Sequence, residues 1–221
     1  MRPRLLLLLA LVSLVVPRSG FALAAPHLQF QLDGLASLPV GSYSASDVQA
    51  RDVFGVAGGF AATVSLGIRR SLCVAARVGA SASRKDGTVR FSHPLSAGGL
   101  GDPTPYAVRR KLVSVPIHGL LQYRHRLGSL GLTLLAGAGI NTSTQHLSVS
   151  SAGTPLFAIA GYQQSFSSLF GVGLSYPLAP DWALTLGGTF EQVVTDAGDI
   201  WGSGDNPKFF SGTLGVRYPR E

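Results

Sequence analysis

The chain has 221 residues, of which 46% are hydrophobic and only 13% are charged. The charged share is about half that of an ordinary soluble domain. This composition excludes an intrinsically disordered chain and is sufficient for one domain with a large apolar surface. After the N-terminal stretch there is no uninterrupted run of about 18 apolar residues, which excludes a bundle of membrane-spanning helices.

The N-terminus predicts an export signal. Two arginines stand within the first four residues, Leu5–Val16 is apolar, and Ala22-Leu23-Ala24 has the small-x-small pattern of a cleavage site. We therefore predict a signal peptide at residues 1–24 and a single domain at residues 25–221. The alternative is an uncleaved anchor helix, but the apolar stretch is shorter than the roughly 20 residues that a span requires.

A period of two dominates the rest of the chain. From Phe54 to Ile68 every second residue is apolar or glycine, and the residues between them are nearly all small. This alternation predicts a strand with one apolar face, and the second face lacks the long polar side chains of a soluble antiparallel sheet. The same pattern predicts eight strands, at residues 28–38, 54–68, 72–84, 111–124, 130–141, 165–177, 182–194 and 208–218.

The connections between these strands alternate in length. Short links at 69–71, 125–129 and 178–181 alternate with long links at 39–53, 85–110, 142–164 and 195–207. Outer-membrane barrels combine short periplasmic turns with long external loops. We predict an all-β, eight-stranded antiparallel up-and-down transmembrane barrel, with a local bulge or kink at Pro116, which has no N–H for the strand ladder.

Aromatic residues mark both ends of the predicted barrel. Membrane interfaces favour tyrosine and tryptophan, whose rings combine an apolar body with a polar group. Phenylalanines with the same outward parity lie near the opposite rim. The predicted interface residues are Tyr123, Tyr176, Trp182 and Tyr218 at the short-turn rim, and Phe54, Phe166, Phe190 and Phe210 at the other.

Three stretches carry a family resemblance: Val115–Tyr123, Gly137-Ala138-Gly139 and Gly171–Tyr176. On these residues the chain resembles the outer-membrane β-barrel domain family, the small porin-like barrels related in architecture to the transmembrane domain of OmpA. The resemblance implies the fold, the compartment and recognition by the outer-membrane insertion machinery. Such barrels commonly end on an aromatic residue, whereas here Pro219-Arg220-Glu221 follow Tyr218.

Polar residues with inward parity predict a network inside the barrel. An eight-stranded barrel is only wide enough to be filled by side chains, and a charge enclosed there needs a partner. We expect Asp33 and Glu191 to pair with Arg77 and Arg217, either merely satisfying the interior or acting as a gate. The predicted lumen set is Gln29, Gln31, Asp33, Arg77, His118, Gln122, Glu191 and Arg217.

Basic residues flank the second long link and predict a contact with lipopolysaccharide phosphates through charge-assisted hydrogen bonds. These residues are Arg84, Lys85, Arg109, Arg110 and Lys111. The alternative is a solvated loop base. Removing the three arginines of the signal from 18 basic residues leaves 15, against 11 acidic ones. This small excess lies mainly at strand ends, so we expect no nucleic-acid partner.

We expect no catalysis, metal or cofactor. His146 and Ser148 form a His-x-Ser pair similar to that of the lipid A deacylase barrels, but no carboxylate partner is identifiable. We predict a monomeric outer-membrane protein with a structural or surface-interaction role and a plugged lumen. Two alternatives remain: a narrow porin-like channel for small solutes, and an adhesin or binding module that uses the external loops.

Overall fold

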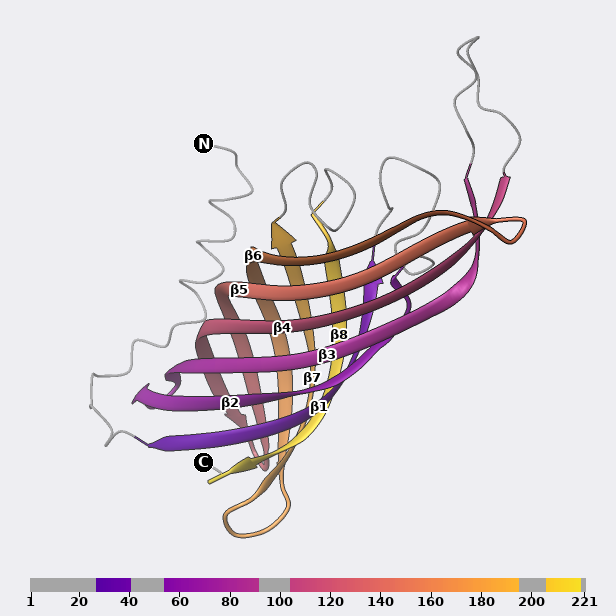
Figure 1. Cartoon of the computed structure of the whole chain (residues 1–221). Helices are drawn as coiled ribbons and strands as arrows, with labels where there is room; N and C mark the ends of the chain where they lie inside the picture. Colours follow the sequence, from indigo (N-terminus) through magenta and orange to yellow (C-terminus); the bar gives the residue numbers. More distant parts are fainter. Residues whose placement is uncertain (1–26, 41–53, 92–103, 195–205, 220–221) are drawn as a thin grey trace, which may run out of the picture.

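The computed structural model describes residues 27–40, 54–91, 104–194 and 206–219, which form a closed barrel of eight antiparallel strands (Figure 1). Each strand pairs with its neighbours in the chain, and β1 pairs with β8. The predicted all-β, up-and-down architecture is therefore confirmed, whereas the predicted signal peptide lies outside the described residues. The strands are β1 (Leu28–Val40), β2 (Ala57–Arg69), β3 (Leu72–Phe91), β4 (Thr104–Leu127), β5 (Leu130–Ser151), β6 (Thr154–Pro177), β7 (Ala183–Val194) and β8 (Lys208–Tyr218).

The alternation of residues gives the barrel two unlike faces. In β1, Phe30 and Leu32 point outward and are 51% and 57% exposed, while Gln29 and Asp33 point inward and are buried. Because successive side chains leave a strand on opposite sides, every strand repeats this arrangement. The barrel wall is apolar outside and polar inside, as a barrel surrounded by lipid requires. None of the described residues forms a helix long and apolar enough to cross a membrane.

Four strands continue beyond the rest of the wall and form an open sheet, visible at the upper right of Figure 1. The β2–β3 pairing ends at Ala57↔Ser83, and the β6–β7 pairing begins at Phe166↔Val194. Beyond these pairs only β3, β4, β5 and β6 remain hydrogen-bonded to one another. We call this sheet the extension, defined as residues 84–91, 104–111 and 146–160.

The extension corrects two predicted loops. Most of 85–110 and nearly all of 142–164 are strand, and β5 and β6 are joined by a turn at Ala152-Gly153. The reason is a reversal of polarity. Val108 and Val149 are buried on the inner face of the extension, whereas the barrel wall carries its large apolar side chains outside. The strands were predicted from apolar residues at outward positions. The predicted strands therefore end where the apolar residues change to the inner face.

An apolar cluster lies inside the barrel end that carries the extension. Phe54 belongs to this cluster and is only 4% exposed, so the prediction that it faces lipid is wrong. Gly55, with φ of +68°, precedes β2 and removes Phe54 from the alternation of that strand. The Phe54 ring packs edge-on against Phe209, and the Arg110 guanidinium lies 3.8 Å from its centroid. The buried members are Phe54, Val108, Leu112, Val149 and Val193.

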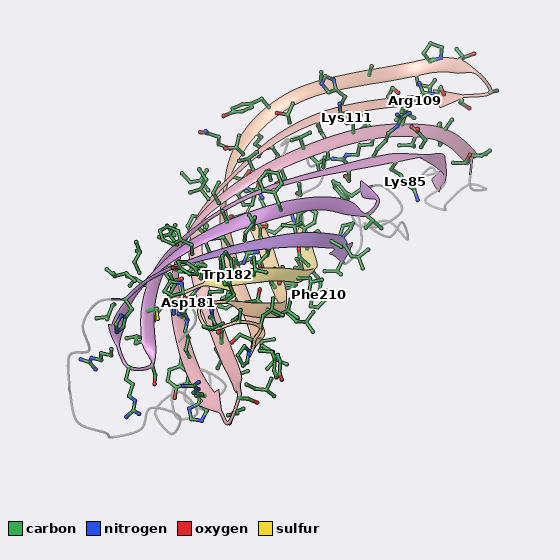
Figure 2. All side chains as sticks on the ribbon, turned by 90° about the horizontal axis from the view of Figure 1, so that it is seen from below. Lys85, Arg109, Lys111, Asp181, Trp182 and Phe210 are labelled. Carbon is green, nitrogen blue, oxygen red and sulfur yellow. The ribbon has the colours of Figure 1, made fainter. Side chains whose placement is uncertain are left out.

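Aromatic side chains occupy the opposite, short-turn rim. Tyr176 and Trp182 are 54% and 46% exposed, and the Trp182 ring lies 5.0 Å from that of Tyr218. Figure 2 shows Trp182 beside Asp181 at the β6–β7 turn, and Phe210 on β8. Tyr123 is half-buried at the same rim.

Pro116 interrupts a strand ladder without changing its register. The β3–β4 pairs run from Val78↔Ile117 directly to Ser81↔Ser114, and the offset is the same on both sides of the gap. Of the predicted bulge or kink, the unchanged register excludes the bulge. The missing N–H of proline removes a ladder bond on the β3 side, while the pairing of Pro116 with Asn141 of β5 is retained.

Candidate functional site

The structure places the predicted polar set inside the barrel. Gln31 and Glu191 are half-buried, and the other six are 1% to 8% exposed. These six are Gln29, Asp33, Arg77, His118, Gln122 and Arg217. Seven residues of the set form three groups along the lumen, each with its own hydrogen bonds, and Arg217 has a separate contact.

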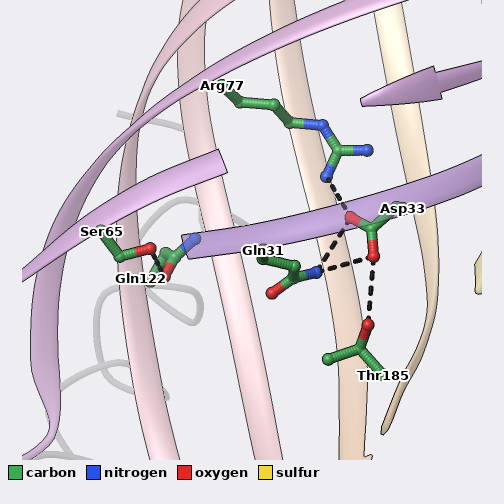
Figure 3. Close-up of polar contacts among 6 residues, drawn as sticks. All are labelled: Gln31, Asp33, Ser65, Arg77, Gln122 and Thr185. Carbon is green, nitrogen blue, oxygen red and sulfur yellow. Dashed lines mark hydrogen bonds and ion pairs between the residues drawn. The ribbon is translucent and has the colours of Figure 1, made fainter. Parts of the chain in front are cut away.

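Asp33 is the centre of the first group, shown in Figure 3. Its carboxylate lies 3.8 Å from Nη1 of Arg77, and both residues are buried. Nε2 of Gln31 lies 3.0 and 2.9 Å from the two carboxylate oxygens, and the Thr185 hydroxyl donates to Oδ1 at 3.1 Å. The charge of Asp33 thus has both a cation and neutral donors, which offset the loss of water around a buried carboxylate.

Glu191 belongs to the second group. Nδ2 of Asn141 donates to its Oε1 at 2.8 Å, and Nε2 of His118 lies 3.7 Å from the same oxygen. The His118 ring is also 2.8 Å from the Ser167 hydroxyl. Asn141 in turn accepts a hydrogen bond from Ser143 at 2.9 Å. The second group therefore connects four strands: His118 lies on β4, Asn141 on β5, Ser167 on β6 and Glu191 on β7.

The third group lies toward the short-turn rim and includes Arg124, which the sequence interpretation left out of the lumen set. Arg124 is 5% exposed and donates to Gln29 and, at 2.7 Å, to Gln122. Gln122 also accepts a hydrogen bond from Ser65 at 3.2 Å. The signal was present in the sequence, because Arg124 shares the parity of Gln122 and His118 in one strand.

Arg217 donates a hydrogen bond to the Ser175 hydroxyl at 2.7 Å. The expected ion pair between Arg77 and Asp33 is present, and Arg217 contacts a hydroxyl of β6. The reason is position along the barrel. Arg217 stands at the end of β8, beside the short-turn rim, where Ser175 of β6 is within reach.

Glycines opposite the large inward residues make room for this network. Gly139 is paired with His118, and Gly215 with Asp33. A methyl group on Gly139 would collide with the carbonyl oxygen of Ile117, and one on Gly215 would collide with the Asp33 carboxylate. The small residues of the inner face therefore leave space that long polar side chains of neighbouring strands fill.

Small cavities lie between the side chains of the lumen. Three interior cavities have volumes of about 50, 30 and 40 Å³. Because one water needs roughly 10–15 Å³, each cavity has room for only a few waters.

The predicted basic contact residues divide between two faces of the extension. Arg84 and Arg109 are outside, with side chains 71% and 76% exposed, and Lys111 is exposed beside them. Arg110, by contrast, is 1% exposed on the inner face and donates to Gln145. Lys85 is half-buried with the same inward parity. Adjacent residues of a strand project to opposite faces of the sheet, so the five predicted cations cannot all belong to one binding surface.

Catalytic or metal-binding geometry is not evident in the part of the chain that the structure describes. Those residues contain no group of three or more His, Cys, Asp and Glu that could hold a metal ion. His146 and Ser148 lie on the outer face of β5 and are exposed.

Comparison with known proteins shows a similarity of fold rather than of sequence. No protein-family model matches the chain, and no curated protein matches it. OmpT, the outer-membrane protease from Escherichia coli, has 10% identity and a TM-score of 0.50, with 91% of this chain and 99% of that chain covered.

Two further solved structures are similar. Neisserial surface protein A has 17% identity and a TM-score of 0.46, covering 89% of this chain and all of that chain. Ail of Yersinia pestis, solved with the heparin analogue sucrose octasulfate, has 15% identity and a TM-score of 0.49, and the match covers 86% of this chain and 97% of that chain. At these identities the comparison concerns the fold alone. This similarity of fold agrees with the closed strand order, the apolar outer face and the polar lumen. The chain therefore has the fold of the outer-membrane β-barrel proteins.

Proposed function

We propose that the protein is an integral barrel of the bacterial outer membrane with a closed lumen, which exposes the extension on the cell surface and performs no catalysis. The observation that carries this proposal is the bonded polar interior. All eight strands contribute a buried or half-buried polar side chain to it. A lumen crossed by hydrogen bonds and an ion pair between side chains of different strands supports a closed interior and a structural or surface-interaction role.

The outer face supports the location. A closed barrel satisfies its backbone hydrogen bonds internally, so its strands can cross a bilayer. The outward Phe30, Leu32 and Ile117 are each more than half exposed, which water would disfavour and lipid accepts. In bacterial barrels the short turns lie on the periplasmic side. This supports a position of the extension outside the cell.

Membrane fractionation tests the location. The mature protein should appear in the outer-membrane fraction and migrate differently on a gel with and without boiling, because a folded barrel resists detergent. Recovery as soluble periplasmic material would refute the membrane assignment.

Bilayer conductance tests the closed lumen. We expect no channels from the wild type, because bonded polar side chains from facing strands fill the part of the lumen that the structure describes. Arg77→Ala removes a buried cation from the lumen, and Arg70→Ala removes one from the exposed β2–β3 turn as a matched control. Channels from Arg77→Ala alone would show that the network acts as a plug. Steady wild-type conductance would instead support the narrow pore.

A surface-interaction role is favoured specifically by the extension, which is regular sheet rather than loop. Replacing residues 146–160 by a two-residue Asn-Gly turn shortens one hairpin and leaves all eight strands of the wall. The shortened barrel should still show heat-modifiable migration. Loss of cell adherence to abiotic and cellular surfaces would support the adhesin role, and unchanged adherence would refute it.

A further inference from the structure

The outer face of the extension carries basic side chains in one row across neighbouring strands. Arg84 of β3 is paired with Lys111 of β4, Lys111 with His146 of β5, and His146 with Ala160 of β6. Neighbouring strands are about 4.8 Å apart, so the three polar side chains span about 10 Å. Figure 2 shows Lys111 on this part of the sheet.

The next row contains the rest of the charge. Asp86 of β3 is paired with Arg109 of β4, which is paired with Ser148 of β5. The Asp86 carboxylate is 2.8 Å from Arg84 and 3.3 Å from Arg109. Two arginines therefore share one carboxylate, and Lys111 adds a third cation, so the two rows have a net positive charge.

The two rows border a shallow concavity of about 410 Å³. Ala158 and Ala160 of β6 form part of its lining and leave space beside His146 and Ser148. Cationic, imidazole and hydroxyl groups therefore line an open volume together with apolar methyl groups. This combination suits an anionic group attached to a bulkier molecule, because the cations bind the charge while the alanines admit the body.

The arrangement is unfavourable when the concavity is empty. Arg84 and Lys111 are directly opposite each other on neighbouring strands, and like charges in that position destabilise a sheet. The part of the chain that the structure describes provides only Asp86 as a carboxylate for Arg84 and Arg109. An anion between Arg84 and Lys111 would remove the repulsion.

The rows lie one step above the lipid-facing wall. The adjacent outward row, toward the barrel, contains Ala82, Val113, Thr144 and Tyr162. Val113 is 36% exposed and Tyr162 is 63% exposed. Aromatic rings with a polar group mark the interface between hydrocarbon and headgroups. Cations directly above that level are at the depth of lipid phosphates in the outer leaflet.

We propose that Arg84, Arg109, Lys111 and His146 form a binding site for the phosphate groups of a saccharide lipid in the outer leaflet, with Ser148 as an additional hydrogen-bond donor. The proposal rests on the outer-membrane location and outward orientation proposed above. It assigns the site to side chains of the outer face. Arg110 also lines the concavity, but its side chain is buried and donates to Gln145 on the inner face, and Lys85 has the same inward parity.

The experiment measures retention of bis-phosphorylated lipid A by the full mature barrel, refolded in detergent. Arg84→Gln/Lys111→Gln removes two cations of one row. Lys85→Gln/Arg70→Gln is the matched control, because it removes the same charge from an inward-facing position of β3 and from the opposite rim. Heat-modifiable migration of each variant verifies the fold. Dephosphorylated lipid A and inorganic pyrophosphate serve as competing probes.

We expect the Arg84→Gln/Lys111→Gln variant to weaken lipid A retention at least about tenfold, while the control variant stays within about twofold of the wild type. Dephosphorylated lipid A should bind the wild type at least about tenfold more weakly. Equal retention by both variants, or equal binding of the dephosphorylated lipid, would overturn the site. Full displacement by pyrophosphate at equal concentration would overturn the lipid as its source and indicate a free phosphate compound.

These results are distinguishable from a failure of the proposed function. A folded, heat-modifiable variant that retains lipid A refutes the phosphate site and leaves the barrel assignment intact. A wild-type protein that fractionates as soluble material refutes the membrane location itself.

Discussion

Arg77→Ala should destabilise the barrel strongly, because it leaves the Asp33 carboxylate enclosed without its cation. The two groups are 3.8 Å apart and their residues are 8% and 1% exposed. At that separation and an effective dielectric constant of about 20, the Coulomb attraction is about 4 kcal/mol. Gln31 and Thr185 still donate to Asp33 in the variant and offset part of the loss. We expect a decrease of about 3 kcal/mol in the free energy of unfolding, at the lower end of the range for broken buried pairs.

The assay is reversible urea unfolding of the barrel in phospholipid vesicles, followed by tryptophan fluorescence and by the fraction that shows heat-modifiable migration. Arg77→Ala/Asp33→Ala provides the decisive comparison, because it removes both charges together. The double variant should be more stable than the sum of the two single effects predicts, by at least about 1 kcal/mol. A change below about 1 kcal/mol for Arg77→Ala, or strictly additive effects, would refute a coupled buried pair.

Two further substitutions test the packing of the barrel. Gly139→Ala should lower the free energy of unfolding by about 1–3 kcal/mol, because its methyl group collides with the Ile117 carbonyl. Gly58→Ala is the control and should be nearly neutral in the same urea assay, because no atom lies within 4 Å of the added methyl group. Equal effects of the two substitutions would contradict the close approach at Gly139. Phe54→Ala should lower the free energy of unfolding of the barrel by about 3 kcal/mol, because it empties part of the apolar cluster and removes the ring beneath Arg110. A decrease below about 1 kcal/mol would contradict the burial of Phe54 in that cluster.

Much of the architecture follows from local patterns in the chain. The alternation of apolar and small residues determines which face of each strand meets lipid, because successive side chains project in opposite directions. The observed β8 begins and ends at the predicted residues 208 and 218, and β1 and β7 differ from their predicted bounds by no more than two residues. Inward parity likewise places Asp33 and Arg77 on the same side of the wall before any tertiary contact is known.

Only the tertiary structure decided the details that depend on distance between strands. The extension was missed because its apolar face turns inward above the wall, so Val108 and Val149 follow the opposite parity rule from Val113 and Ile117. Phe54 was misplaced because the positive φ of Gly55 changes the direction of the chain. Pairing partners such as Asn141 for Glu191 come from different strands.

The sequence by itself therefore determined the period, the faces and the number of strands, because these depend on neighbouring residues alone. The tertiary structure decided which cations share a surface. Arg109 and Lys111 project outward beside Arg84, while Arg110 between them is buried over Phe54. A row of charges across β3, β4 and β5 exists only through the register of strands that lie far apart in the chain, and a register is set by pairing between strands rather than by local propensity.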